Sequence, residues 1–363
     1  MNKDPKISNI QVRGIIVSTV IGVGVLTLPN TLGAILGKDG WMAIIIGGLL
    51  SFPLLTIING IFKKNPGKDY FEIGKSTLGN IIFTICLIIF LAYLIIFLAF
   101  VTRNLGELIK AFLLPTTPVE LIIFLFILST SYIASYEIDV IARAGYFIYP
   151  VIIGFAVLVI IVSLPTADFT NVLPVFQSDL KSIVNGVKET FFTFTGFEMI
   201  LFVIPYVEEK EKTLKSSILA MGIVTLINFA LFIMTLTQFS IEEIKRHTYP
   251  VLMLAKLIDL PGYFLQNLDG VFMAIWVLAI FGSMAPAYFG AGKILCKIFK
   301  TKSHKYFIWM LIPLIFWTSL IPRNFEELYM SLGKYFNILG FISVVIVPLS
   351  IFIVGKIKKK VGK

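Results

Sequence analysis

Charged residues are scarce in this chain and make up only 14% of its 363 residues. Cysteine and histidine are scarcer, with two of each, so neither a disulfide framework nor a clustered metal site is indicated. Cys86 and Cys296 fall within or at the edge of apolar segments, where a thiol behaves as a small apolar side chain. Glycine motifs that bind nucleotide phosphates are missing, so nothing in the sequence indicates nucleotide-driven pumping.

Residues suited to catalysis are equally sparse. His247 and His304 fall in loops on opposite sides of the predicted spans, and no serine or cysteine has a base at a known spacing. We therefore predict no catalytic residue, no metal and no cofactor. The net charge of +10 does not indicate nucleic-acid binding, because the basic residues are spread over short loops rather than gathered in one patch with aromatics.

Apolar residues dominate instead, at 57% of the chain, and give a mean hydropathy of +0.92. They form runs near or above the ~20 residues that cross a bilayer as a helix, whereas a membrane barrel would show short alternating strands. The sequence thus predicts an all-α integral membrane protein, with residues 1–363 as a single transmembrane domain. Ten spans are expected, at residues 9–36, 40–62, 80–109, 118–135, 141–164, 183–205, 213–239, 266–298, 305–322 and 335–356.

The polar loops predict how the spans are oriented. About two thirds of the Lys and Arg residues, including those of the main basic loop at 63–80, fall on the side that holds both ends, so we expect both termini in the cytoplasm. Residues 1–13 lead into the first span without a small-residue cleavage site, which argues against a removable signal peptide. The longest polar insert, 240–266, is expected on the other side as a loop with short surface helices.

The first span contains the most informative segment, IGVGVLTLPNTLG at residues 21–33. Gly22 and Gly24 favour departure from helical geometry and Pro29 lacks an N–H donor, so the segment predicts a break at mid-membrane depth. Unwound backbone there must line a cavity, where its polar groups can bind the carboxylate and ammonium of a solute. Close helix packing through small residues is the alternative interpretation of the two glycines.

A second break is predicted in the sixth span, where FTFTGFE at residues 192–198 places Gly196 at a comparable depth. Each half of the chain, about 9–164 and 183–356, then opens with an interrupted helix, as in transporters built from inverted repeats. Glu198 is an ionisable residue inside this span. Its carboxylate could pair with a substrate ammonium, take up a proton, or brace the break by accepting backbone hydrogen bonds.

Other polar positions are weaker candidates. Two pairs are four residues apart and predict local ion pairs on one helical face, with a role in gating as the alternative: Arg103 with Glu107, and Asp139 with Arg143. Hydroxyl groups that could reach a cavity belong to Tyr93, Ser283 and Tyr288.

These features resemble the permease-like B subunit of Ger-type endospore germinant receptors, within the amino acid-polyamine-organocation superfamily. The resemblance rests on the chain length, the IGVGVLTLPNTLG and FTFTGFE segments and the basic KKNPGKDYFEIGK loop, and it covers nearly the whole chain. It implies two inverted five-helix repeats as in the leucine transporter, a place in the spore inner membrane, and A and C subunits as partners. The ligand site that it implies lies among Gly22, Val23, Gly24, Val25, Thr193, Thr195, Gly196, Phe197 and Glu198. Helix position alone adds Tyr93, Ser283 and Tyr288 as further contributors.

The resemblance also implies a function. Such a subunit would bind a small nutrient, for example an amino acid, and trigger spore germination through a shift between two conformations. A proton- or sodium-coupled amino-acid transporter would use the same kind of site, so the sequence leaves both functions open. An intramembrane enzyme is a distant third hypothesis.

Overall fold

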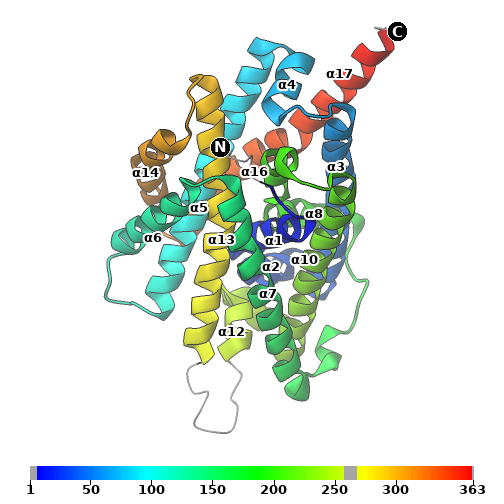
Figure 1. The fold of residues 1–363 in the computed structure, drawn as a ribbon. Coiled ribbons are helices and arrows are strands. Elements are labelled where there is room, and N and C mark those ends of the chain that lie inside the picture. The colour runs from blue at the N-terminus through cyan, green and yellow to red at the C-terminus, as the bar shows by residue number, and fades with distance from the viewer. Residues whose placement is uncertain (1–5, 257–267, 362–363) are drawn as a thin grey trace.

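The chain forms a bundle of helices that run back and forth between two ends (Figure 1). The computed structural model describes residues 6–256 and 268–361. Within these residues, six helical runs are long and apolar enough to cross a membrane, and three shorter apolar helices accompany them. The all-helical membrane fold predicted from the sequence is confirmed.

The first half of the chain makes five passes, and its first helix is interrupted. The passes are α1 (Asn9–Val20) with α2 (Val23–Leu36), α3 (Gly40–Lys64), α5 (Asn80–Phe112), α6 (Val119–Ala134) and α7 (Ile138–Ser163). The 3-10 turn η1 (Gly37–Asp39) joins α2 to α3, and the short helix α4 (Tyr70–Leu78) joins α3 to α5.

The second half repeats this plan and also opens with an interrupted helix. A connection containing η2 (Leu164–Thr166) and η3 (Phe169–Val172) leads into it. The passes are α8 (Leu180–Phe194) with η4 (Phe197–Met199), α9 (Ile200–Val203) and η5 (Ile204–Tyr206), then α10 (Lys210–Gln238), α13 (Leu268–Ile298), α14 (Lys305–Leu320), and a last pass made of α15 (Phe325–Leu328), η6 (Tyr329–Gly333), α16 (Lys334–Phe341), η7 (Ile342–Ile346) and α17 (Val347–Val361).

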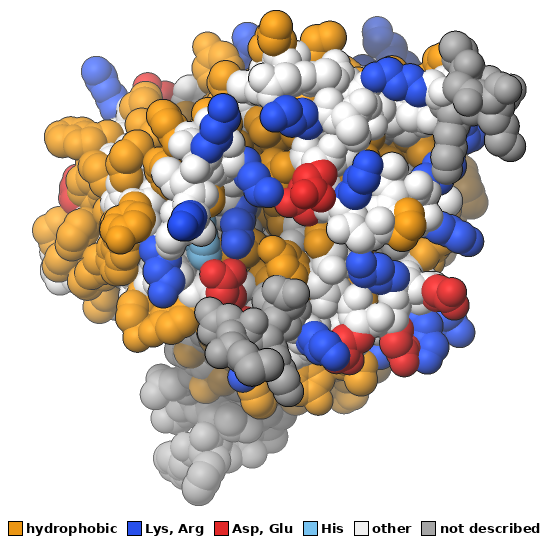
Figure 2. Space-filling view, turned by 45° about the horizontal axis from the view of Figure 1, so that its top comes forward, with side chains coloured by type: hydrophobic (Ala, Val, Ile, Leu, Met, Phe, Trp, Pro, Cys, Tyr) orange, Lys and Arg blue, Asp and Glu red, His pale blue; other side chains and the backbone are white. Residues whose placement is uncertain are grey.

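The two ends of the bundle differ in charge. We call the end at which α17 finishes the C-terminal face, and the opposite end, next to α12 (Pro250–Lys256), the α12 face (Figure 1). Figure 2 shows Lys and Arg side chains spread over the C-terminal face. Exposed ones include Lys63, Lys210 and Lys302. Between the faces, large apolar side chains such as Trp317 are exposed on the bundle's sides, as a lipid environment requires.

Helix α1 lies in the middle of the bundle because glycines let it approach its neighbour closely. Gly14 of α1 faces Gly145 of α7, and a Cβ atom added to Gly14 would lie 2.8 Å from the carbonyl carbon of Gly145. Small residues permit such close crossings between membrane helices, where dispersion and polar contacts replace the hydrophobic effect. The first interrupted helix is thereby held in the protein interior rather than in lipid.

Two expectations about segments at the α12 face need correction. The last pass begins at Phe325 rather than at 335, because the side chain of Asn324 accepts a hydrogen bond from the N–H of Glu327 and caps a charged first turn. In the 240–266 insert, α11 (Ile241–Arg246) is a short helix as predicted, but α12 is largely buried against its neighbours rather than lying on the surface. Its sequence PVLMLAK is apolar on every side except at Lys256, which explains the burial. Residues 257–266 of the insert lie outside the described residues.

Candidate functional site

The first break is shorter than the sequence predicts. Helix α1 ends at Val20 and α2 begins at Val23, and Gly22 between them has φ −132° and ψ −142°. Gly24 and Pro29 belong to α2, so the prediction that they interrupt the span is wrong. A proline removes a single backbone donor, and a membrane helix packed among others tolerates that loss.

The second break is centred on Gly196, as predicted. Helix α8 ends at Phe194, Thr195 is extended, and Gly196 has a φ of 118°, which side chains with a Cβ atom rarely adopt. A Cβ atom at Gly196 would lie 2.9 Å from the carbonyl oxygen of Thr19, at the end of α1. The two breaks therefore touch each other through their backbones.

Glu198 braces the second break. The N–H of Gly196 donates a hydrogen bond to its Oε2 at 2.7 Å, and the hydroxyl of Tyr93 on α5 donates to its Oε1 at 2.6 Å. Both oxygens thus have a partner in the protein, and the side chain is buried. Of the three roles considered from the sequence, this geometry matches the bracing role, because the carboxylate is directed at protein groups.

A small cavity lies between the two breaks, with a volume of about 20 Å³. It has room for about one water molecule, far less than an amino acid needs. Six of the predicted site residues line it: Gly22, Val23, Gly24, Thr193, Thr195 and Ser283. The sequence interpretation missed Thr19, Val20, Phe97 and Val101, which complete the lining.

The remaining predicted residues do not line this cavity. Val25 and Phe197 are buried in the core, and Tyr93 and Glu198 bond each other beside the second break. Tyr288 is fully buried, and its hydroxyl has no hydrogen-bond partner among the described residues.

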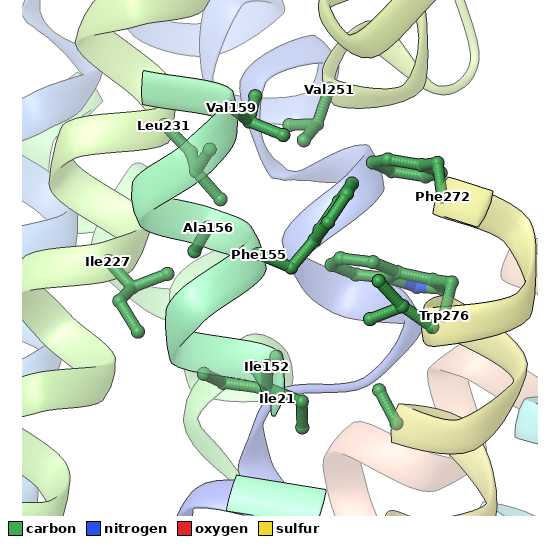
Figure 3. A pocket seen from close by; sticks show the side chains of 12 residues that line it. Ile21, Ile152, Phe155, Ala156, Val159, Ile227, Leu231, Val251, Phe272 and Trp276 are labelled. Atoms are coloured by element: carbon green, nitrogen blue, oxygen red, sulfur yellow. The ribbon is translucent and has the colours of Figure 1, made fainter. Parts of the chain in front are cut away.

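Apolar side chains line the other side of the first break. Figure 3 shows Ile21 among apolar side chains that include Ile152, Phe155 and Trp276. The cavity that they enclose measures about 10 Å³, and the ring of Phe272 stacks on Trp276. Since the described residues on this side offer the break no polar partner beyond the indole, the side that faces Thr193 and Ser283 is the polar one.

A larger cavity, which we call the outer cavity, lies toward the α12 face between α2, α8 and the last pass. Its volume is about 450 Å³, within the range of small-molecule sites. Thr193 lines both the outer cavity and the small cavity between the breaks, so the two adjoin. The outer cavity also receives Glu189, Tyr329, Lys334 and Asn337.

Toward the C-terminal face the broken helices are tied together. The N–H of Ile7 donates to the carbonyl oxygen of Tyr206 at 3.0 Å, and the N–H of Glu208 donates to the carbonyl oxygen of Ile7 at 3.1 Å. Ile7 is fully buried. The segment before α1 is thus bound to the end of the sixth span on this side of the site.

The two local ion pairs predicted from the sequence are confirmed. Arg103 contacts Glu107 at 2.7 Å, and Arg143 contacts Asp139 at 2.7 Å. Among the described residues, no group of three or more His, Cys, Asp or Glu side chains is arranged to hold a metal ion.

Comparison with known proteins identifies the family. The profile of a family described as spore germination protein matches residues 6–328. This chain belongs to the spore germination protein family. Spore germination protein B2 of Bacillus subtilis (strain 168) is 25% identical over 362 residues, which cover 99% of this chain and 97% of the relative. Spore germination protein GerLB of Bacillus cereus is 27% identical over 365 residues, with coverages of 99% and 96%.

The fold of this spore germination protein is similar to those of solved transporters. MhsT in complex with L-phenylalanine superposes with a TM-score of 0.69 at 16% identity, covering 97% of this chain and 89% of MhsT. Mhp1, a nucleobase-cation-symport-1 family transporter in a closed conformation with bromovinylhydantoin bound, gives 0.67 at 13% identity, with coverages of 94% and 78%. These likenesses concern the fold, and they confirm the predicted leucine-transporter-like arrangement with broken first and sixth helices.

The charged lining of the outer cavity was missed in this spore germination protein, although one signal was available. Glu189 lies inside the predicted 183–205 span, so the rule that singled out Glu198 applies to it equally. The predicted spans leave Lys334 in a loop, because the charged start of the last pass interrupts the apolar run that hydropathy detects.

Proposed function

We propose that this spore germination protein is the permease-like subunit of a nutrient germinant receptor, which binds a small nutrient at its helix breaks and thereby triggers germination. An amino acid is the proposed nutrient. The observation that carries the proposal is the meeting of the two breaks, at Gly22 and Gly196, beside a cavity lined by hydroxyl and backbone groups. Similarity over the whole chain to proteins named spore germination proteins supports it.

The size of the cavity between the breaks supports a receptor mechanism. At about 20 Å³ it admits no amino acid until α2, α8 or their neighbours separate. A nutrient that binds the widened conformation better than the narrow one shifts the equilibrium toward the former. Occupation of the site would then be coupled to a change of shape that other subunits can detect.

We further propose the setting of the protein. The C-terminal face is cytoplasmic, because most of the Lys and Arg residues fall on this side. The membrane is the spore inner membrane, the outer cavity opens away from the spore core, and the A and C subunits of the receptor are the partners.

A coupled amino-acid transporter is the second candidate, with a proton or sodium as the coupling ion. It is favoured by the asymmetry of the site, which adjoins a large cavity on one side and has the backbone contact between Ile7 and Tyr206 on the other. Alternating access needs one side that can open while the other is closed. Substrate-dependent uptake by the purified protein in liposomes would favour this function.

Germination of spores that lack the gene tests the receptor proposal. The response to one or more nutrients of a panel should be lost, and the wild-type gene should restore it. Gly24→Val should not restore it, because a Cβ atom there lies 3.0 Å from Thr193 Oγ1 and 3.1 Å from Thr193 Cα. Gly154→Val is the matched control, since nothing lies within 4 Å of a Cβ atom at Gly154.

Both variants must reach the membrane at equal levels, which immunoblotting of membrane fractions measures. Deletion spores that respond to every nutrient as wild-type spores do would contradict the receptor function. Restoration by Gly24→Val would contradict the location of the site at the breaks.

A further inference from the structure

The outer cavity presents charges of opposite sign. Glu189 projects from α8 and Lys334 from the first turn of α16, and both line the cavity of about 450 Å³. Neither side chain forms an ion pair with a described residue. The cavity therefore offers one acidic and one basic group, each with its charge available to a third molecule.

A further polar group in the cavity lacks a partner. The side-chain oxygen of Asn337 is buried and has no hydrogen-bond partner among the described residues. Asn337 lies three residues after Lys334, on the same helical face, and lines the same cavity. This oxygen is covered by protein, so a donor from another molecule can reach it only after the Asn337 side chain turns toward the cavity.

The backbone of the last pass explains why so many of its residues reach the cavity. The lining residues of this pass recur every four positions, as Tyr329, Gly333 and Asn337 and again as Met330, Lys334 and Ile338. Residues three and four apart lie on one face of a helix, so the last pass presents a single face to the cavity. The π-helical turn η6 (Tyr329–Gly333) forms the first part of this face, and π-turns are frequent at functional sites.

From these observations we infer that the outer cavity binds a small zwitterion, with its ammonium group at Glu189 and its carboxylate at Lys334. The inference rests on the proposed function and specifies its ligand class. An ammonium group donates to the carboxylate of Glu189, and a carboxylate accepts from the Lys334 ammonium. A molecule of one charge alone would pair with only one of these two exposed side chains.

Binding to the purified full-length chain in detergent tests the inference. The probes are the neutral L-amino acids, each compared with its decarboxylated amine and its deaminated acid, for example L-valine with isobutylamine and 3-methylbutanoate. At least one amino acid should bind, and both of its monopolar analogues should bind about 10- to 100-fold more weakly, as loss of a hydrogen bond to a charged group implies.

Neutralising variants test which group of the zwitterion each of the two charged side chains binds. Glu189→Gln and Lys334→Gln should each weaken amino-acid binding about 10- to 100-fold. Glu189→Gln should spare the acid analogue, and Lys334→Gln should spare the amine. Glu120→Gln and Lys110→Gln remove charges from exposed residues that do not line the cavity, so they should leave binding unchanged. The double exchange Glu189→Lys with Lys334→Glu should recover part of the affinity, because a zwitterion can bind in the reverse direction.

Thermal unfolding of each variant verifies that it is folded. The inference is overturned if no amino acid of the panel binds the folded wild-type chain, or if both neutralising variants bind as the two controls do. Its failure can be separated from that of the proposed function. Spores in which Gly24→Val abolishes the nutrient response but Glu189→Gln and Lys334→Gln do not would refute the zwitterion site alone. An unchanged response of deletion spores would refute the receptor function.

Discussion

Replacing Gly196 by alanine is the most direct test of the geometry at the second break. Gly196 has a φ of 118°, and holding a residue with a side chain in such a sparsely populated conformation costs about 1–3 kcal/mol. The added Cβ atom would also lie 2.9 Å from the Cγ2 and the carbonyl oxygen of Thr19. Forcing an extra methyl group into a packed site costs about 1–3 kcal/mol more, so the expected loss in the free energy of unfolding is about 2–6 kcal/mol.

Gly154→Ala provides the matched control for this substitution. Gly154 lies within α7, and a Cβ atom there has nothing within 4 Å. The same change should be neutral or stabilise the protein by up to about 1 kcal/mol, because alanine favours a helix more than glycine does. Thermal unfolding of the purified variants in one detergent compares the two directly, and germination of spores that carry them compares function.

A second substitution separates the two contributions at Gly196. Thr19→Ser removes Cγ2 but leaves the carbonyl oxygen of Thr19 in place, so the double variant with Gly196→Ala should recover only part of the lost stability. Equal unfolding temperatures and equal germination for Gly196→Ala and Gly154→Ala would refute the reasoning. They would mean that the chain does not need a left-handed residue at this point or close contact between the breaks.

Two further substitutions test hydrogen bonds. Tyr93→Phe removes the donor to Oε1 of Glu198 and should lower the free energy of unfolding by about 1.5–3 kcal/mol. Tyr70→Phe is the control and should not lower it, because the buried hydroxyl of Tyr70 has no partner among the described residues. Chemical denaturation measures both variants. Burial raises the pKa of Asp39 in η1, but hydrogen bonds from the backbone N–H groups of residues 176–178 outweigh this and hold its pKa below the ordinary value. The ionised Asp39 carboxylate should stabilise the fold above the unfolded pKa of about 3.9, and this stabilisation should be lost as the pH falls through the lower folded pKa. Asp39→Asn should therefore lower the unfolding temperature at pH 7 and remove this acid-dependent step. An unfolding temperature of Asp39→Asn that equals that of the wild type at pH 7 would contradict the role of the carboxylate.

Much of the fold could be predicted from the sequence, because a bilayer imposes strong rules on hydropathy. Runs of apolar residues located the passes, and Gly22 and Gly196 marked both breaks because glycine tolerates backbone geometry that other residues do not. The prediction of a break at Pro29 is wrong because proline breaks helices in water but is accommodated within the membrane helix α2. Hydropathy also does not detect the start of the last pass at Phe325, because the first turn capped by Asn324 is charged.

The arrangement of the site was less accessible to sequence reasoning. The role of Glu198 depends on Tyr93, which lies 105 residues away in the chain, and no local pattern reveals such a pairing. The outer cavity likewise depends on how the last pass packs on α2 and α8. Its π-helical turn has no residue signature comparable to the glycines of the breaks.

The shared wall of the two cavities links ligand recognition to the breaks. Glu189 and Thr193 are four residues apart on α8 and therefore lie on one face of that helix, with Glu189 in the outer cavity and Thr193 in both cavities. Thr193 also contacts the start of α2, since a Cβ atom at Gly24 would lie 3.0 Å from its Oγ1. A solute that draws Glu189 toward Lys334 therefore moves the same turn of α8 that packs against the first break. Binding in the outer cavity then alters the contact between the two broken helices before any nutrient has reached the gap between them.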